Sequence, residues 1–275
     1  MAAFTTSLKD GSVTTRFLPQ ELVNGIIDYH DPQIHAHHRI LTSCSQVCHG
    51  FSVRSRELLF AKIQLKYQPL ELGGSQVARF ARLLNRSPHL GLYVKRLTLN
   101  ICGQAIFCSA ETKLGDRFLS EIFQRLKRLK SLLINPNHDG YLSQALYSGG
   151  VVNFDPTIFC QLQSLRSLEI YDAYCTFPKP PQSESLTPVR LEGLKIFLSP
   201  CVNSGLDDWI FNTPSVIDVS GLRSLCIPDP KVELLEHYSR LFHLCSMRLE
   251  ILDIELDGKS LLLFLTNLLP LLTCL

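Results

Sequence analysis

The side chains most able to do chemistry gather near the N-terminus. Histidine and cysteine supply seven candidate metal ligands within twenty residues: His30, His35, His37, His38, Cys44, Cys48 and His49. Zinc sites favour paired ligands two to four residues apart on rigid turns. Here Cys44 and Cys48 instead fall on the apolar face of a predicted helix, and most of the histidines fall in the polar stretch 31–38. We therefore favour a solvated His-rich loop over a zinc site, and expect no metal and no other cofactor.

Catalytic arrangements are equally scarce. Asp207 and Asp208 form an acid pair of the kind used in general acid–base catalysis, but beside the apolar run that begins at Trp209 they are better explained as an acidic helix start. The sequence has no nucleophile elbow, phosphate-binding loop or dinucleotide fingerprint. No feature singles out one cysteine as a nucleophile beside a base. We therefore expect a protein that is not an enzyme.

Composition excludes several further classes. The 27 Lys and Arg residues against 25 Asp and Glu give a net charge of +2, which argues against nucleic-acid binding. Ten cysteines without a Cys-x-x-Cys pair, after a start that lacks the apolar core of a signal peptide, indicate reduced thiols packed as small hydrophobes. The longest apolar stretch, 261–269, is too short to span a membrane. We expect a soluble cytoplasmic or nuclear protein with no nucleic-acid or membrane partner.

The first part of the chain is predicted to be helical after a polar start. Residues 1–16 are rich in Ser and Thr and lack apolar periodicity, so we expect them to be disordered. Apolar residues then recur every three or four positions, which predicts short helices over 18–26, over 41–51 and from about residue 55. Three short helices bury little apolar surface between them, so this segment is expected to rest on a partner or on the next domain.

The order of residues in this helical segment resembles an F-box. The matching elements are Phe17-Leu-Pro-Gln-Glu-Leu22, Ile26-Ile27, Leu41-Thr-Ser-Cys-Ser-Gln-Val-Cys48, Phe51 and Leu59-Phe60. They follow the family's Leu-Pro-x-Glu opening, its Ile/Leu pair, its Val-Cys and its closing aromatic residue. The resemblance is to the F-box proteins abundant in mushroom-type fungi, and it covers residues 17–63.

The resemblance implies that residues 17–63 dock on the Skp-type adaptor of a cullin-type ubiquitin ligase. The positions that match those the family uses for the adaptor groove are Leu18, Pro19, Ile26, Leu41, Val47, Cys48 and Phe51. The alternative for each is that it packs the core of the F-box itself, and we expect about half of them to do so.

The remainder of the chain, 64–275, contains a repeated leucine pattern. Leucine supplies 49 of the 275 residues, and the strand signature Leu-x-x-Leu-x-Leu begins at Val94, Leu129, Leu165, Leu191, Leu222 and Leu249, with a further match at Phe60. Helical periods over 77–84, 118–126 and 234–245 precede three of these strands. Alternating helices and strands predict a parallel sheet with right-handed crossovers. We expect an irregular leucine-rich-repeat-like solenoid, interrupted by a Pro-rich loop at 176–189.

In such a solenoid, every second strand residue points to the concave face on which partners bind. The candidate target-binding residues are Arg96, Asn100, Leu133, Glu169, Tyr171, Lys195 and Phe197. Tyr171 and Phe197 are the candidate anchors, since aromatic side chains dominate binding energy; the alternative is that they only cover the surface. At the other end, we expect an apolar helix at about 259–269 to cap the last repeat poorly.

The predicted fold class is therefore α/β, a short N-terminal helical F-box followed by the solenoid. The function expected from it is that of a substrate receptor in a Skp–cullin–F-box ubiquitin ligase, with the adaptor, a cullin and an unknown target protein as partners. The alternative is a leucine-rich-repeat interaction scaffold without a ubiquitin-ligase role. Adaptor binding distinguishes the two.

Overall fold

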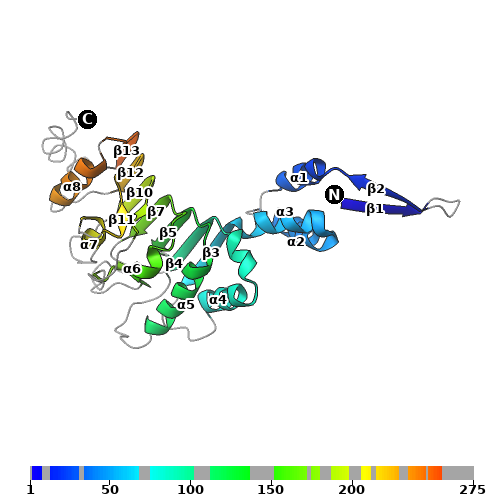
Figure 1. The fold of residues 1–275 in the computed structure, drawn as a ribbon, viewed down its shortest axis with the longest axis horizontal. Coiled ribbons are helices and arrows are strands. Elements are labelled where there is room, and N and C mark those ends of the chain that lie inside the picture. Colours follow the sequence, from blue (N-terminus) through cyan, green and yellow to red (C-terminus); the bar gives the residue numbers. More distant parts are fainter. Residues whose placement is uncertain are drawn as a thin grey trace. The chain divides into compact units, whose positions relative to one another are not determined.

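The computed structural model describes residues 2–7, 13–30, 34–67, 75–101, 112–136, 152–171, 175–179, 187–197, 206–211, 215–228, 235–245 and 247–255. These residues form a mixed α/β fold with eight α-helices and a seven-stranded parallel sheet (Figure 1). The chain divides into two compact units. The first comprises Met1–Ile63 with Tyr93–Lys95, and the second comprises Gln64–Leu92 with Arg96–Leu275. None of the described helices is long and apolar enough to cross a membrane.

The first unit begins with two strands, β1 (Ala2–Ser7) and β2 (Val13–Leu18), which pair antiparallel. The structure differs here from the disorder expected for residues 1–16. The expectation weighed only the polarity of the segment. Threonine and phenylalanine occur in both strands, β2 also begins with a valine, and these β-branched and aromatic residues fit a pleated strand well.

Three helices follow: α1 (Gln20–Asp28), α2 (His35–Val47) and α3 (His49–Ala61). Their bounds correct the prediction at two points. The His-rich stretch is not a loop throughout, because α2 begins at His35. The helix predicted over 41–51 is broken at Cys48, whose extended backbone (φ −160°, ψ 170°) separates α2 from α3. Apolar spacing marks only the buried part of a helix, so it finds neither an exposed first turn nor a sharp break between two helices.

The core of the first unit is small. Val23 and Ile27 of α1, Leu41 of α2 and Phe51 of α3 form a buried cluster. Cys44, Cys48, Leu58 and Leu59 are partly buried and pack against it. The two cysteines therefore behave as the small hydrophobes that the sequence predicts.

The second unit is built on the large sheet. Its strands are β3 (Lys62–Tyr67), β4 (Arg96–Ile101), β5 (Ser131–Pro136), β7 (Ser167–Tyr171), β10 (Gly193–Phe197), β12 (Ser224–Pro228) and β13 (Ile251–Glu255). Neighbours in the sheet follow the order of the chain from β3 to β13. Each strand lies at one of the predicted leucine signatures, the match at Phe60 included, so these seven strand predictions are confirmed.

The register aligns the leucine signatures with one another. The central leucines form one ladder of Cα partners across six strands: Leu97, Leu132, Leu168, Leu194, Leu225 and Leu252. From β4 to β12 these leucines are buried, as are the aliphatic residues two positions further along each strand. Stacking like residues from strand to strand therefore builds the core on one face of the sheet.

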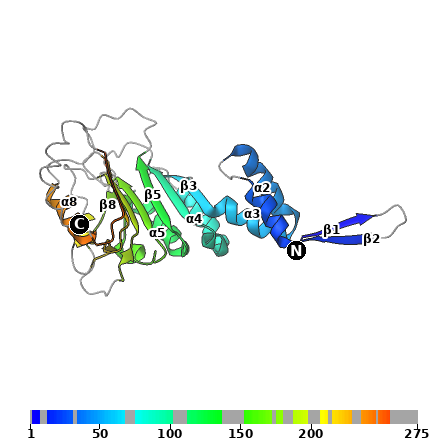
Figure 2. The same cartoon turned by 90° about the horizontal axis from the view of Figure 1, so that it is seen from above.

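Helices lie along that face, as Figures 1 and 2 show: α4 (Gln76–Arg86), α5 (Thr112–Arg125), α6 (Pro156–Phe159), α7 (Leu206–Phe211) and α8 (Leu235–Cys245), with a 3-10 helix at Pro88–Leu92. The helices predicted over 77–84, 118–126 and 234–245 are confirmed by α4, α5 and α8. Local caps set two helix starts. The Ser75 hydroxyl accepts a hydrogen bond from the Ala78 N–H, and the Asp155 carboxylate accepts one from the Thr157 N–H.

Two pairs of short parallel strands form separate two-stranded sheets: β6 (Val152–Asn153) pairs with β8 (Cys175–Thr176), and β9 (Val189–Arg190) pairs with β11 (Ile217–Asp218). The Pro-rich loop predicted over 176–189 therefore begins and ends in strand residues. Its central part, 180–186, and the capping helix predicted at 259–269 lie outside the described residues.

Candidate functional site

The sheet of the second unit has a second face, opposite to the one on which its described helices lie. In β7, Leu168 and Ile170 are buried, whereas Ser167, Glu169 and Tyr171 between them keep solvent exposure. The same alternation in the other strands defines what we call the open face. From β4 to β13 it comprises Arg96, Thr98, Asn100, Ser131, Leu133, Asn135, Ser167, Glu169, Tyr171, Gly193, Lys195, Phe197, Ser224, Cys226, Ile251, Asp253 and Glu255. All seven residues predicted for target binding lie on it.

The structure brings four of these seven residues together on β7 and β10. The rings of Tyr171 and Phe197 stack with centroids 3.8 Å apart and an interplanar angle of 11°. Two residues earlier on the same two strands, Lys195 and Glu169 form an ion pair. Lys195 Nζ lies 3.6 Å from Glu169 Oε1 and 5.4 Å from the centroid of the Phe197 ring. We call Tyr171 and Phe197 the aromatic pair. It presents apolar surface beside an ion pair, an arrangement suited to binding an amphipathic side chain.

The remaining three predicted residues extend the face over β5 and β4. Leu133 is the register partner of Glu169, and Thr98 of β4 is the partner of Leu133. Arg96 and Asn100 flank Thr98 on β4. The open face is therefore one continuous surface, on which one strand, β5, lies between the strand of Arg96 and that of Tyr171.

Partial burial and neighbouring charge set the protonation of this surface. Desolvation, then the Glu169 charge, raises the pKa of Tyr171. Desolvation, then the Asp253 charge, raises the pKa of Cys226, whose Sγ lies 3.6 Å from Asp253 Oδ2. For Lys195, desolvation acts to lower the pKa, but the Glu169 charge and the other nearby groups together raise it. At neutral pH the phenol and the thiol therefore keep their protons and the lysine stays charged.

The residues predicted for adaptor binding separate into two groups. Leu41 is fully buried and Phe51 is only 8% exposed, so both belong to the core of the first unit, and Cys48 packs against that core. Pro19, Ile26 and Val47 are exposed, with Ile26 at 50% and Val47 at 62%. The side chain of Leu18 lies outside the described part of the structure. Leu41, Phe51 and Cys48 therefore pack the core of the first unit, which is the alternative that the sequence left open for each motif residue.

Further apolar side chains are exposed on the helices that carry the exposed motif residues Ile26 and Val47. Leu22 of α1 and Tyr29, the C-cap residue of α1, lie about one helical turn on either side of Ile26. Ile40 lies two turns before Val47 on α2. Small soluble units seldom expose several large aliphatic and aromatic side chains on adjoining helix turns unless a partner covers them. The helical period predicts Leu22 on the apolar face of this helix, whereas 56% of the residue is exposed in the structure.

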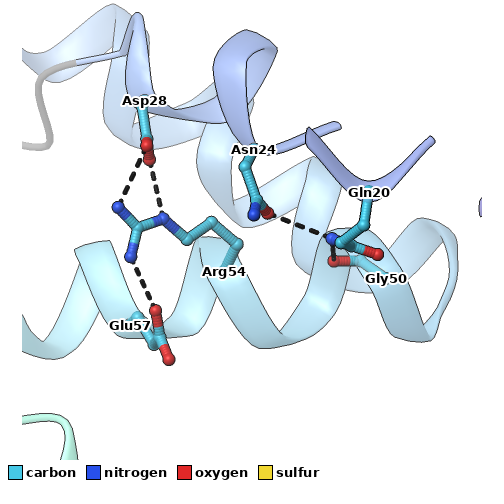
Figure 3. Close-up of polar contacts among 6 residues, drawn as sticks. All are labelled: Gln20, Asn24, Asp28, Gly50, Arg54 and Glu57. Carbon is cyan, nitrogen blue, oxygen red and sulfur yellow. Dashed lines mark hydrogen bonds and ion pairs between the residues drawn. The ribbon is translucent and has the colours of Figure 1, made fainter. Parts of the chain in front are cut away.

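A polar cluster joins α1 to α3 (Figure 3). Arg54 of α3 forms two hydrogen bonds to the Asp28 carboxylate, at 2.7 and 3.0 Å, and one to Glu57 at 2.7 Å. These bonds, that to Asp28 first, raise the pKa of Arg54 above its ordinary value. Gln20 donates to Asn24 and to the Gly50 carbonyl.

The cluster borders a hollow of about 320 Å³ that is lined by Gln20, Asn24, His49, Gly50, Val53, Arg54 and Glu57. This cluster was not predicted from the sequence. Arg54 and Glu57 are three residues apart, a spacing that is visible in the sequence, but Asp28 comes from another helix. Because the guanidinium is already paired with two carboxylates, we assign the cluster the role of fixing α1 against α3.

The candidate metal ligands and the acid pair proposed from the sequence make contacts within the fold. His30 and His37 meet edge to face with ring centroids 5.0 Å apart, while Cys44 and Cys48 pack on the core. Among the described residues, no three His, Cys, Asp or Glu side chains gather as a metal site. Asp207 and Asp208 lie in the first turn of α7, as predicted for an acidic helix start. The Asp207 carboxylate also pairs with Nδ1 of His237 in α8 at 2.6 Å.

Comparison with models of known protein families, with curated proteins and with solved structures gives no significant match. What the chain binds must therefore be inferred from its own surfaces. Two of them stand out: the open face with its aromatic pair, and the exposed apolar residues of α1 and α2.

Proposed function

We propose that this protein is a substrate-receptor subunit of a Skp–cullin–F-box ubiquitin ligase. In this proposal the first unit is the F-box, which docks on a Skp-type adaptor and through it on a cullin. The second unit is an irregular, leucine-rich-repeat-like right-handed solenoid whose open face recruits a target protein. The protein binds and positions its partners and performs no chemistry itself. The observation that carries the proposal is the exposure of apolar side chains at F-box motif positions.

Three properties of the second unit support the solenoid. The strand order follows the chain, the leucines stack in ladders, and the helices lie on one face. A backbone contact also repeats from strand to strand. The carbonyl of Lys130 accepts from two consecutive N–H groups at the start of β7, and the carbonyls of Arg166, Glu192 and Arg223 do the same for β10, β12 and β13. A repeated contact between neighbouring units is what a one-dimensional array of repeats requires.

Exposed motif residues in the first unit support adaptor docking. Ile26 and Val47 match the F-box positions that face the adaptor, and both leave half or more of their surface in solvent. Burying an aliphatic side chain of this size contributes roughly 1.5–3 kcal/mol. Covering these side chains and Leu22 with a partner therefore gives a favourable driving force for association.

The open face supports target recruitment but not the ubiquitin connection by itself. Its aromatic pair fits a scaffold without a ligase role equally well. The two candidate functions differ in what binds α1 and α2, so an adaptor-binding measurement separates them.

Replacing exposed motif residues is expected to weaken adaptor binding strongly without unfolding the chain. We expect the double variant Ile26→Asp/Val47→Asp to bind a recombinant Skp-type adaptor more than about tenfold more weakly, because two apolar contacts become buried charges. Calorimetric titration of the full chain with the adaptor measures this loss. The matched control, Leu83→Asp/Met247→Asp, changes two exposed apolar residues of the second unit. Absence of wild-type binding, or equal binding by both variants, would refute the ligase proposal.

Removing the aromatic pair is expected to impair target capture alone. We expect Tyr171→Ala/Phe197→Ala to reduce recovery of captured proteins by about tenfold or more, because aromatic anchors dominate interface energies. Quantitative mass spectrometry after affinity capture from host extract compares this variant with the wild type. Leu244→Ala/Met247→Ala, at two other exposed apolar positions, serves as the control. Adaptor binding should stay unchanged in both. An identical set of captured proteins would remove the aromatic pair from the target site.

A further inference from the structure

Charge is distributed unevenly over the open face. At one edge, Asp253 and Glu255 of β13 are exposed, and neither forms an ion pair within the described part of the chain. Near the other edge, Arg96 of β4 is also exposed and has no ion pair among the described residues. Between them, the charges of Glu169 and Lys195 compensate each other. The face is therefore acidic on the β13 side, balanced in the middle and basic on the β4 side.

The acidic edge lies within electrostatic reach of the aromatic pair. The Glu255 charge is one of the influences that raise the pKa of Tyr171, after desolvation and the Glu169 charge. Asp253 is the register partner of Cys226, and Cys226 in turn is the partner of Lys195 beside Phe197. Only β12 therefore lies between the apolar ring surface on β10 and two carboxylates that have no cationic partner among the described residues. Arginine suits such an arrangement, because its guanidinium pairs with carboxylates and its plane and stem pack on aromatic rings.

The spacing of the two edges limits the length of the ligand. Five strand-to-strand steps separate β4 from β13. At about 4.8 Å a step they span about 24 Å, which an extended chain of about seven residues covers.

We propose that the open face binds an extended segment of the target that carries an arginine at the β13 edge and an acidic residue about seven positions away, over Arg96. The guanidinium pairs with Asp253 and Glu255, and the side chain packs beside the aromatic pair. This inference rests on the proposed role of the open face in target binding, but it does not depend on the adaptor. Charge complementarity at both edges sets the direction in which the segment lies across the strands.

A peptide selection on the full chain tests the proposal. The probe is a library of random 12-residue peptides displayed on phage, and the enriched sequences are resynthesised with a fluorophore for polarisation measurements. We expect the enriched peptides to share an arginine and an acidic residue about seven positions apart. Enrichment of peptides without a basic residue, or failure to enrich any peptide, overturns the proposal.

Charge variants then test the assigned contacts. We expect Asp253→Asn/Glu255→Gln to weaken peptide binding at least about tenfold, because charge-assisted hydrogen bonds are lost. The control Glu192→Gln/Glu250→Gln removes the same net charge from two exposed carboxylates that precede β10 and β13 and lie outside the open face. We expect Glu255→Arg to regain affinity for a peptide whose arginine is replaced by glutamate. Equal binding by the two neutralised variants, or no regain, overturns the assignment.

The adaptor titration on the same proteins keeps the two proposals distinguishable. A chain that binds the arginine peptides but no adaptor rejects the ligase role and retains this inference. A chain that binds the adaptor but selects no arginine peptide rejects this inference and retains the ligase role.

Discussion

Replacing Trp209 with alanine is expected to lower the free energy of unfolding by about 3–5 kcal/mol, the largest loss we expect from any single substitution. Trp209 of α7 is fully buried in the helical layer of the second unit. Its ring meets three phenylalanine rings, Phe154, Phe159 and Phe177, at centroid distances of 6.5, 5.2 and 5.0 Å. Its indole N–H donates to the Pro178 carbonyl at 2.8 Å. Truncation removes ring packing and a hydrogen bond together, and it leaves a cavity.

Denaturant unfolding followed by far-ultraviolet circular dichroism measures this loss. Trp209→Phe is the informative companion, because it keeps an aromatic ring but leaves the Pro178 carbonyl without its donor. It should cost about 1–3 kcal/mol. Met247→Ala, at a side chain that is 93% exposed, should stay within about 0.5 kcal/mol of the wild type. A loss below about 1 kcal/mol for Trp209→Ala would contradict the role of this cluster as a core.

Replacing Leu41 with alanine is expected to destabilise the first unit by about 2–5 kcal/mol. Leu41 is fully buried between Val23, Ile27 and Phe51, in a core too small to compensate for the cavity. Hydrogen exchange of the amides in α1, α2 and α3 measures the loss locally, whatever the second unit contributes. We expect adaptor binding to fall as well, through unfolding and not through a lost contact.

Val47→Ala separates these two causes. Val47 lies on the same helix as Leu41 but is 62% exposed, so its truncation should leave amide exchange in the first unit nearly unchanged while weakening adaptor binding. If Leu41→Ala left exchange unaltered and lowered only adaptor affinity, the assignment of Leu41 to the core would be wrong.

The strands and the open face were predictable because their signals are local. A period of two along each leucine signature decides which residues of that strand are buried, and this needs no knowledge of the neighbouring strands. Leu168 and Ile170 therefore point into the core, and Tyr171 lies on the exposed side, as predicted. The helix bounds near the N-terminus were less predictable, since an exposed turn such as that at His35 carries no apolar signal.

Residue type also could not divide the F-box motif into core and surface. Leu41 and Val47 are both aliphatic and lie on one helix, yet one is buried and the other exposed. Six positions separate them, about one and two-thirds turns of an α-helix, so the two side chains lie on different sides of α2. Which of these sides is buried depends on how α1 and α3 pack against α2.

The sequence by itself determined the class of fold, the places of the seven strands of the large sheet and the side of that sheet to which each of their residues belongs. Only the tertiary structure decided which distant residues meet. Parallel register stacks Tyr171 on Phe197, and helix packing joins Asp28 to Arg54 and Asp207 to His237. The physical reason is that burial follows a period of a few residues along the chain, whereas a pair contact depends on the register and the crossing geometry of elements far apart in it.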